Sequence, residues 1–198
     1  MQDLSATLTT LPRPKLRLRG LLREILDTII LIGAIYALVN LVSVRFIVEG
    51  PSMQPNFYTG QVLVVSRLHY MMGNPQRGDI VVFNPPNQPA DEPPYIKRII
   101  GLPGDKVEIR ETLVYVNDVL IEEPYINEPC RSSMCPDGSW QLGENEYFVM
   151  GDNRNHSSDS RRFGPITSEA IIGEALIRYW PPADWGLVNR IAYPGDAP

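Results

Sequence analysis

Histidine and cysteine are scarce in this sequence, which contains only two of each among 198 residues. Structural zinc sites use four cysteine or histidine ligands at close spacing. Cys130 and Cys135 are five residues apart, and both histidines lie elsewhere in the chain, so together they make a poor zinc site. We therefore predict no metal site.

Basic residues are also few outside the first 24 positions. That segment contains five of them against two acidic residues, and the rest of the chain contains 13 basic and 21 acidic residues. Proteins that bind nucleic acid contact its phosphates through clustered lysine and arginine. An acidic body with a basic start is therefore predicted not to bind nucleic acid.

Charge is absent from residues 28–44, TIILIGAIYALVNLVSV. As a helix rising about 1.5 Å per residue, this run spans roughly 25 Å, slightly less than a hydrocarbon core of about 30 Å. Asp27 and Arg45 can extend their polar ends toward the two interfaces. A buried core helix would be apolar on one face only, whereas this run is apolar all round. We predict that residues 25–45 form one helix that spans a lipid bilayer.

The same run could belong to a cleavable signal peptide, but it lacks a cleavage site. Cleavage after Ala37 would need a small residue where the sequence has Ile35, and no small pair follows Val44. An uncleaved anchor is therefore predicted. Because the basic residues precede it, residues 1–24 are predicted to be a cytoplasmic tail, with residues 46–198 outside the cytoplasm, in a periplasm or lumen.

Proline, by contrast, is abundant, and its 19 residues exclude a fold made mainly of helices. Alternating apolar and polar residues between turns predict short strands, and Asn117-Asp118 marks a tight hairpin because both residues tolerate left-handed backbone. A short helix is expected only within residues 167–172. We predict a mainly β body, one domain of antiparallel sheet that is barrel-like or sandwiched. The predicted strands are residues 46–48, 61–66, 79–83, 95–100, 107–110, 113–116, 119–121, 146–150 and 170–180.

The two cysteines are compatible with a body outside the cytoplasm. In an oxidising compartment, Cys130 and Cys135 could pair across their short loop, and the alternatives are zinc binding or two free buried thiols. A disulfide is the prediction that we carry forward, with the role of fastening a local loop.

A candidate nucleophile, Ser52, follows the predicted membrane helix in the stretch EGPSMQP. Gly50 and Pro51 favour a tight, fixed turn that can present the serine hydroxyl together with its own N–H. An isolated serine is more often an ordinary turn residue. Catalysis would also need a base that activates the hydroxyl.

Histidine is the usual base, and the chain offers two. His69 lies in an apolar stretch and is expected to be structural. His156 lies in the polar run GDNRNHSSDSRRFG, close in sequence to Asp152 and Asp159, so a serine–histidine–aspartate triad remains possible from composition alone.

Lysine is the competing base. Lys97 lies in the predicted strand YIKRII, where side chains alternate, so Lys97 and Arg98 point to opposite faces. Burial disfavours the ammonium by up to about 3–5 pKa units, and lysine loses its proton far more readily than arginine. A neutral amine near Ser52 could then accept its proton. The alternative is an exposed lysine on an edge strand.

Four segments together resemble type I signal peptidases, serine–lysine enzymes that remove signal peptides from exported proteins. They are EGPSMQP, RGDIVVF, YIKRIIGLPGD and GDNRNHSSDSRRFGPI, which follow the membrane helix in the family's order over residues 25 to about 175. The resemblance implies that Ser52 is the nucleophile and Lys97 the general base, with no cofactor and with the signal peptides of exported preproteins as partners.

The same resemblance assigns supporting roles in the polar run. It implies that Ser157 orients the lysine amine and that Asp159 and Arg161 form an ion pair under the site. Asp152 and Asn153 are implied to help fold that loop.

Substrate pockets are implied as well, because the family cuts after Ala-x-Ala-like sequences. By position, the pocket for the residue before the cut is expected to involve Met53, Phe57, Tyr95 and Ile96. The pocket two residues further upstream is expected to involve Phe46, Val48 and Ile96. One departure stands out: some members carry a hydroxyl for the oxyanion two residues before the nucleophile, where this chain has Gly50.

Overall fold

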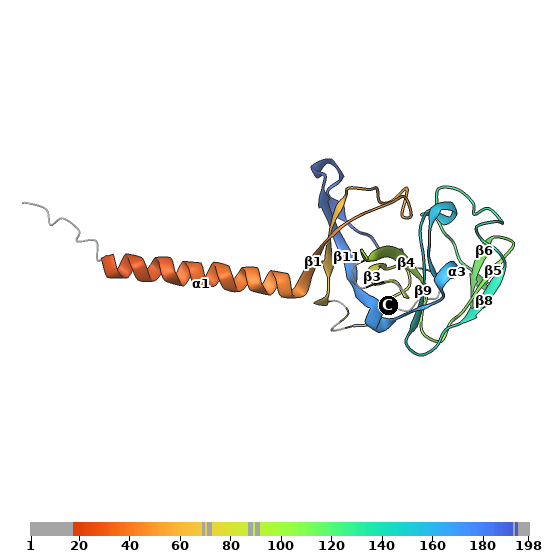
Figure 1. The fold of residues 1–198 in the computed structure, drawn as a ribbon, viewed down its shortest axis with the longest axis horizontal. Helices are drawn as coiled ribbons and strands as arrows, with labels where there is room; N and C mark the ends of the chain where they lie inside the picture. Colours follow the sequence, from red (N-terminus) through yellow and green to blue (C-terminus); the bar gives the residue numbers. More distant parts are fainter. Residues whose placement is uncertain are drawn as a thin grey trace, which may run out of the picture. The chain divides into compact units, whose positions relative to one another are not determined.

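The computed structural model (Figure 1) describes residues 18–68, 70, 73–86, 89, 92–191 and 193. The chain divides into two units, of which the first ends at Asn40 and the second begins at Leu41. The first unit consists of most of helix α1, Leu18–Val42. Residues 20–42 of this helix are long and apolar enough to cross a membrane, with a mean hydropathy of 2.2 and no burial.

Helix α1 begins and ends earlier than the predicted span of residues 25–45. Leu18, where the helix begins, is also the first residue that the structure describes. It ends at Val42 because the next five residues form strand β1, Ser43–Ile47, which pairs with β2, Val62–Ser66. The predicted tail, residues 1–24, lies outside the described residues up to position 17.

The second unit is a mainly antiparallel β body, as predicted. Its larger sheet is curled and has the order β1-β2-β11-β3-β4-β9-β10, with β12 added to β11. Among the described residues its end strands β1 and β10 do not pair, so the barrel-like sheet is open. The remaining strands of this sheet are β3 Ile80–Phe83, β4 Tyr95–Gly101, β9 Glu146–Met150, β10 Ile166–Thr167, β11 Ile171–Trp180 and β12 Gly186–Leu187.

A smaller sheet of order β7-β6-β5-β8 lies at one end of the body (Figure 1). The hairpin that joins β6 to the edge strand β7 turns at Asn117 and Asp118, whose φ angles of 50° and 64° confirm the left-handed turn expected there. The strands are β5 Lys106–Arg110, β6 Leu113–Val116, β7 Val119–Leu120 and β8 Gly138–Gln141.

Several short elements differ from the sequence expectations. Strand β8 was not predicted, because GSWQ lacks an alternating pattern of its own and is held by pairing with β5. The short helix expected within residues 167–172 is a 3-10 turn, Ser168–Ala170. A one-turn helix, α3 at Ser160–Phe163, interrupts the polar run, and the Asp159 carboxylate caps its start by accepting from the Arg161 N–H.

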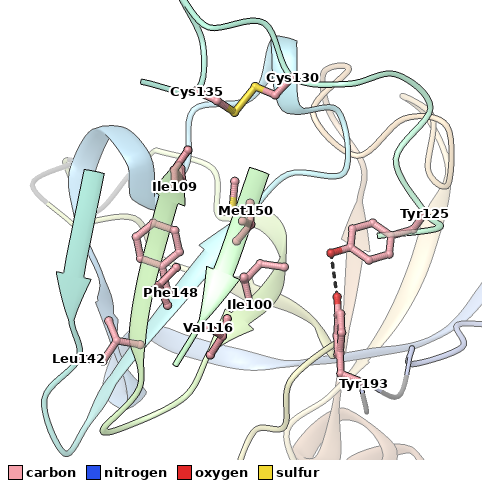
Figure 2. Packing of buried hydrophobic residues seen from close by; sticks show 12 residues of the cluster. Ile100, Ile109, Val116, Tyr125, Cys130, Cys135, Leu142, Phe148, Met150 and Tyr193 are labelled. Atoms are coloured by element: carbon pink, nitrogen blue, oxygen red, sulfur yellow. Dashed lines mark hydrogen bonds between the residues drawn. A yellow bond between two sulfur atoms is a disulfide. The ribbon is translucent and has the colours of Figure 1, made fainter. Parts of the chain in front are cut away.

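Three apolar clusters hold the body together. One joins the smaller sheet to β4 and β9 and includes Ile109, Phe148 and Met150, with the Cys130–Cys135 disulfide at its edge (Figure 2). A second lies under the turn that carries Ser52 and is built from β1, β2, β3, β4 and β11. The third packs on the other face of β3 and β9. The central strands are therefore covered on both faces, which explains their nearly continuous burial.

Candidate active site

Ser52 lies in a compact turn directly after β1. Gly50 has a φ of 77°, a left-handed backbone that glycine adopts without strain. The turn is closed by hydrogen bonds from the Gln54 N–H to the Pro51 carbonyl at 3.1 Å and from the Phe57 N–H to the Met53 carbonyl at 2.9 Å. Glycine therefore suits position 50 of this turn, although it has no side-chain hydroxyl that could stabilise an oxyanion.

The polar loop 151–153 fastens this turn from outside. The Asn153 N–H donates to the Ser52 carbonyl at 3.0 Å, and the Asn153 side-chain amide donates to the Pro51 carbonyl at 3.2 Å. Gly151 packs so closely that a Cβ there would lie 2.5 Å from the Ser52 carbonyl oxygen and 2.3 Å from the Ser157 hydroxyl. The backbone position of Ser52 thus depends on this loop.

We predict that Gly151→Ala reduces the rate of reaction at the Ser52 hydroxyl by about 10²-fold, because the added methyl group displaces the Ser52 backbone by a fraction of an ångström or more. The measurement is the rate at which an acylating serine reagent modifies Ser52. Gly143→Ala is the matched control, since a Cβ there comes no closer than 3.4 Å to the Glu146 side chain. Equal rates in the two variants would contradict the prediction.

Lys97 reaches Ser52 from β4. Its Nζ donates to the Ser52 hydroxyl oxygen at 2.8 Å and to the Ile96 carbonyl at 2.8 Å, and the residue is only 4% exposed. Loss of water around the amine lowers its pKa from 10.5 to about 8; Asp159 and Asp152 act in the opposite direction, and Arg161 lowers the pKa further. A substantial fraction of the amine is therefore neutral near pH 8 and can act as a base.

An ion pair of Asp159 and Arg161 lies below this contact. The guanidinium Nε and Nη2 donate to the two carboxylate oxygens at 2.7 Å each, and the Gly151 N–H donates to the same carboxylate at 2.9 Å. Burial alone would raise the pKa of Asp159, but the Arg161 hydrogen bonds and charge hold it below its usual value. Asp159 is therefore a fixed negative charge that also anchors the loop beside Ser52.

Ser157 lies at the same loop, with its hydroxyl buried against Gly151. Within the described residues this hydroxyl has no hydrogen-bond partner of good geometry, although it is near enough to the Asp159 carboxylate to help lower its pKa. No hydrogen bond joins it to Lys97 in that part of the chain, so its role in orienting the amine stays a prediction.

A second buried ion pair joins the neighbouring residue of β4 to the loop. Arg98 Nε and Nη2 each donate to the Asp152 carboxylate at 2.8 Å, and the guanidinium stacks 4.2 Å from the centre of the Tyr125 ring. Asp152 also accepts from the Asn56 side-chain amide at 2.7 Å. The pair thereby links the strand of Lys97, the loop 151–153 and the turn of Ser52.

His156 does not share this arrangement. Its side chain is exposed at the end of the 3-10 turn Arg154–His156, whose other two residues are buried, and in the part of the chain that the structure describes no hydrogen bond joins it to Ser52. The alternative of a histidine triad has no support in this geometry. His69 lies outside the described residues.

An open cleft of about 410 Å³ lies beside Ser52 and Lys97 and is lined mainly by apolar side chains. Of the six predicted pocket residues, Phe46, Tyr95 and Ile96 line it. Val48, Met53 and Phe57 instead belong to the second apolar cluster and are 1%, 0% and 5% exposed, so they support the cleft from beneath. How deeply each of these side chains is buried could not be read from residue spacing alone.

Other lining residues were missed by sequence reasoning. Val44 follows from the two-residue period of β1, since it shares a face with Phe46, and this signal was available. The other residues lie on strands whose neighbours are distant in sequence, or in loops, and carry no local signal. The missed apolar lining residues are Val44, Ile47, Val65, Val82, Pro93, Pro94 and Ile172.

A serine hydroxyl in contact with a buried amine, beside an open apolar cleft in a β body, is suited to a serine peptidase. A family described as "Signal peptidase, peptidase S26" matches residues 21–180 of the chain. The chain belongs to this signal peptidase family.

Three curated relatives and one solved structure are similar to the chain. "Probable signal peptidase I-1" of Synechocystis sp. is 38% identical over 172 residues, covering 79% of this chain and 84% of the relative. "Probable signal peptidase I-2" of the same organism is 37% identical, covering 72% of this chain and 65% of the relative. "Signal peptidase I" of Bacillus caldolyticus is 36% identical, covering 69% and 79%. A solved signal peptidase I from Enterococcus faecalis, 34% identical, covers 52% of this chain and 97% of that one, with a TM-score of 0.45.

Proposed function

We propose that this protein is a membrane-bound serine endopeptidase that removes signal peptides from exported preproteins after small, Ala-x-Ala-like residues. The observation that carries the proposal is the 2.8 Å contact between the buried Lys97 amine and the Ser52 hydroxyl. Membership of the signal peptidase family supports the choice of substrate.

The proposed chemistry is acyl transfer. Neutral Lys97 takes the proton of Ser52, whose oxygen attacks the carbonyl carbon of the scissile bond. Protonated Lys97 then gives this proton to the leaving amine, and water hydrolyses the acyl-enzyme by the same route. Because Gly50 offers no hydroxyl, we assign stabilisation of the developing oxyanion to the Ser52 N–H. The loss of one oxyanion donor can cost about 3 kcal/mol of transition-state stabilisation.

The cleft supports an extended, apolar peptide with small side chains. Phe46 and Ile96 lie on strands at either side of it, and the space of about 410 Å³ suits a few small residues rather than a bulky segment. The acidic body gives no support for a nucleic-acid partner. We further propose that α1 spans the bilayer with the basic N-terminus in the cytoplasm and the body outside.

The test uses the full chain, purified in detergent, with a preprotein whose signal peptide ends in Ala-x-Ala. We expect one cut after the second alanine, identified by mass spectrometry of both products, and no cut when that alanine is replaced by leucine. An acylating serine inhibitor should add to Ser52. Absence of both cleavage and adduct would show a binding module rather than a peptidase.

The pH dependence tests the choice of base. With the pKa of Lys97 near 8, kcat/KM should rise with pH to a plateau, with its midpoint near pH 8 and about a tenth of the plateau at pH 7. His156→Ala should leave this curve unchanged, since that side chain is exposed. A midpoint near pH 6.5 that disappears in His156→Ala would instead identify histidine as the base.

A further inference from the structure

The Cys130–Cys135 disulfide lies against the side chain of Arg161, away from the cleft. Arg161 Nη1 is 3.0 Å from the Cys135 sulfur and 3.5 Å from the Cys130 sulfur, and it donates to the Met134 carbonyl at 3.1 Å and to the Arg154 carbonyl, outside the disulfide loop, at 2.9 Å. The side chain of Arg161 is only 3% exposed. The disulfide lies at the edge of the first apolar cluster (Figure 2). The loop that it closes therefore contacts the Nη1 side of the Arg161 guanidinium.

The other half of the guanidinium reaches the active site. Its Nε and Nη2 hold the Asp159 carboxylate, which in turn accepts from the Gly151 N–H. Gly151 packs on the Ser52 carbonyl. A continuous set of contacts thus runs from the disulfide through one arginine to the turn that carries the nucleophile.

The charged groups facing the Lys97 amine show what this arginine does. Asp159 and Asp152 favour its protonated form, whereas Arg161 opposes it, and the Tyr95 ring lies 5.2 Å away. If Arg161 moves away from Asp159, the pKa of Lys97 rises, because the two carboxylates still favour the protonated amine and the opposing positive charge is further away. Entry of water around the amine would raise this pKa as well.

We propose that the Cys130–Cys135 disulfide is a positioning element for Lys97, holding Arg161 against Asp159 so that cleavage activity depends on the oxidation state of the two cysteines. The inference rests on the proposed role of Lys97 as base. Reduction by a dithiol transfers two electrons and two protons to the disulfide, which becomes two thiols while the dithiol becomes a disulfide. The loop 131–134 is then no longer closed over Arg161.

The test is the pH profile of kcat/KM for Cys130→Ser/Cys135→Ser and for the wild-type chain. We expect the midpoint of the rise to move up by about one pH unit, which reduces kcat/KM at pH 7 about tenfold and leaves it within about twofold of wild type at pH 10. A purely structural role would lower activity equally at every pH. An unchanged midpoint, or such a uniform loss, would overturn the proposal.

Two further measurements test the proposal if the double cysteine variant does not fold. Wild-type protein reduced after folding and alkylated at both cysteines, as checked by mass spectrometry, should show the same shift, and Arg161→Met should shift the midpoint in the same direction. Arg162→Met is the matched control, because that neighbouring side chain is exposed, and it should leave the profile unchanged. If wild type itself does not cleave, the proposed function fails instead.

Discussion

Replacing Ser52 by alanine or Lys97 by methionine should each reduce kcat/KM for preprotein cleavage by at least about 10³-fold. The hydroxyl and the amine form one reacting unit at 2.8 Å, so either loss removes the attack step. Groups that act as a unit are strongly non-additive, and the double variant should therefore be no less active than the single variants. Methionine matches the length of lysine without offering a base, and the rate measured under single-turnover conditions reports the loss.

Two controls separate loss of chemistry from loss of fold. Lys106→Met removes an exposed lysine and should leave the rate unchanged, and His156→Ala should do the same. Denaturant unfolding should show that Ser52→Ala is as stable as wild type. A Lys97→Met protein that retains full activity would rule out lysine as the base.

Asp152→Asn should lower the free energy of unfolding by about 3–5 kcal/mol, the second large effect that we expect. The Arg98 and Asp152 side chains are 3% and 0% exposed, so neutralising the carboxylate leaves a guanidinium buried without a counter-charge. The change also weakens the hydrogen bond from Asn56. Denaturant unfolding in detergent, followed by fluorescence, measures the loss.

A compensating change and an exposed pair provide the comparison. Arg98→Met/Asp152→Leu removes both charges and should recover most of the stability lost in Asp152→Asn. Asp118→Asn breaks an ion pair with Arg110 whose two side chains are 46% and 73% exposed, and it should have almost no effect. If Asp152→Asn and Asp118→Asn were equally mild, the buried pair would not have the structural role that we assign to it.

Much of the β body followed from local patterns. The predicted strand at residues 146–150 has the same bounds as β9, Glu146–Met150, because it is buried and flanked by turn residues. The order of strands did not follow: β11 pairs with β2 and β3, about 100 residues earlier in the chain. Pairing at that distance depends on side-chain packing across the whole body, which no short window of sequence contains.

The candidate site, too, was predictable from the sequence only in part. Ser52 and Lys97 could be singled out from residue chemistry and the family resemblance, but their distance depends on how the sheet curls. The burial of Met53 beneath the cleft, and the contact between Arg161 and the disulfide, required the folded chain. The spacing of residues along a strand predicts which face of the sheet a side chain occupies. How deeply that side chain is buried depends on what packs over the face in the folded protein.

The burial of Lys97 also means that the reactive centre weakens the fold it belongs to. Because the pKa is lowered from 10.5 to about 8, the unfolded chain binds a proton more tightly than the folded one, which destabilises the native state by about 3 kcal/mol below pH 8. That deficit shrinks as the pH rises from 8 to 10.5. Reactivity and stability therefore conflict at this position of β4, because the burial that lets the amine act as a base also lowers the free energy of unfolding below pH 8.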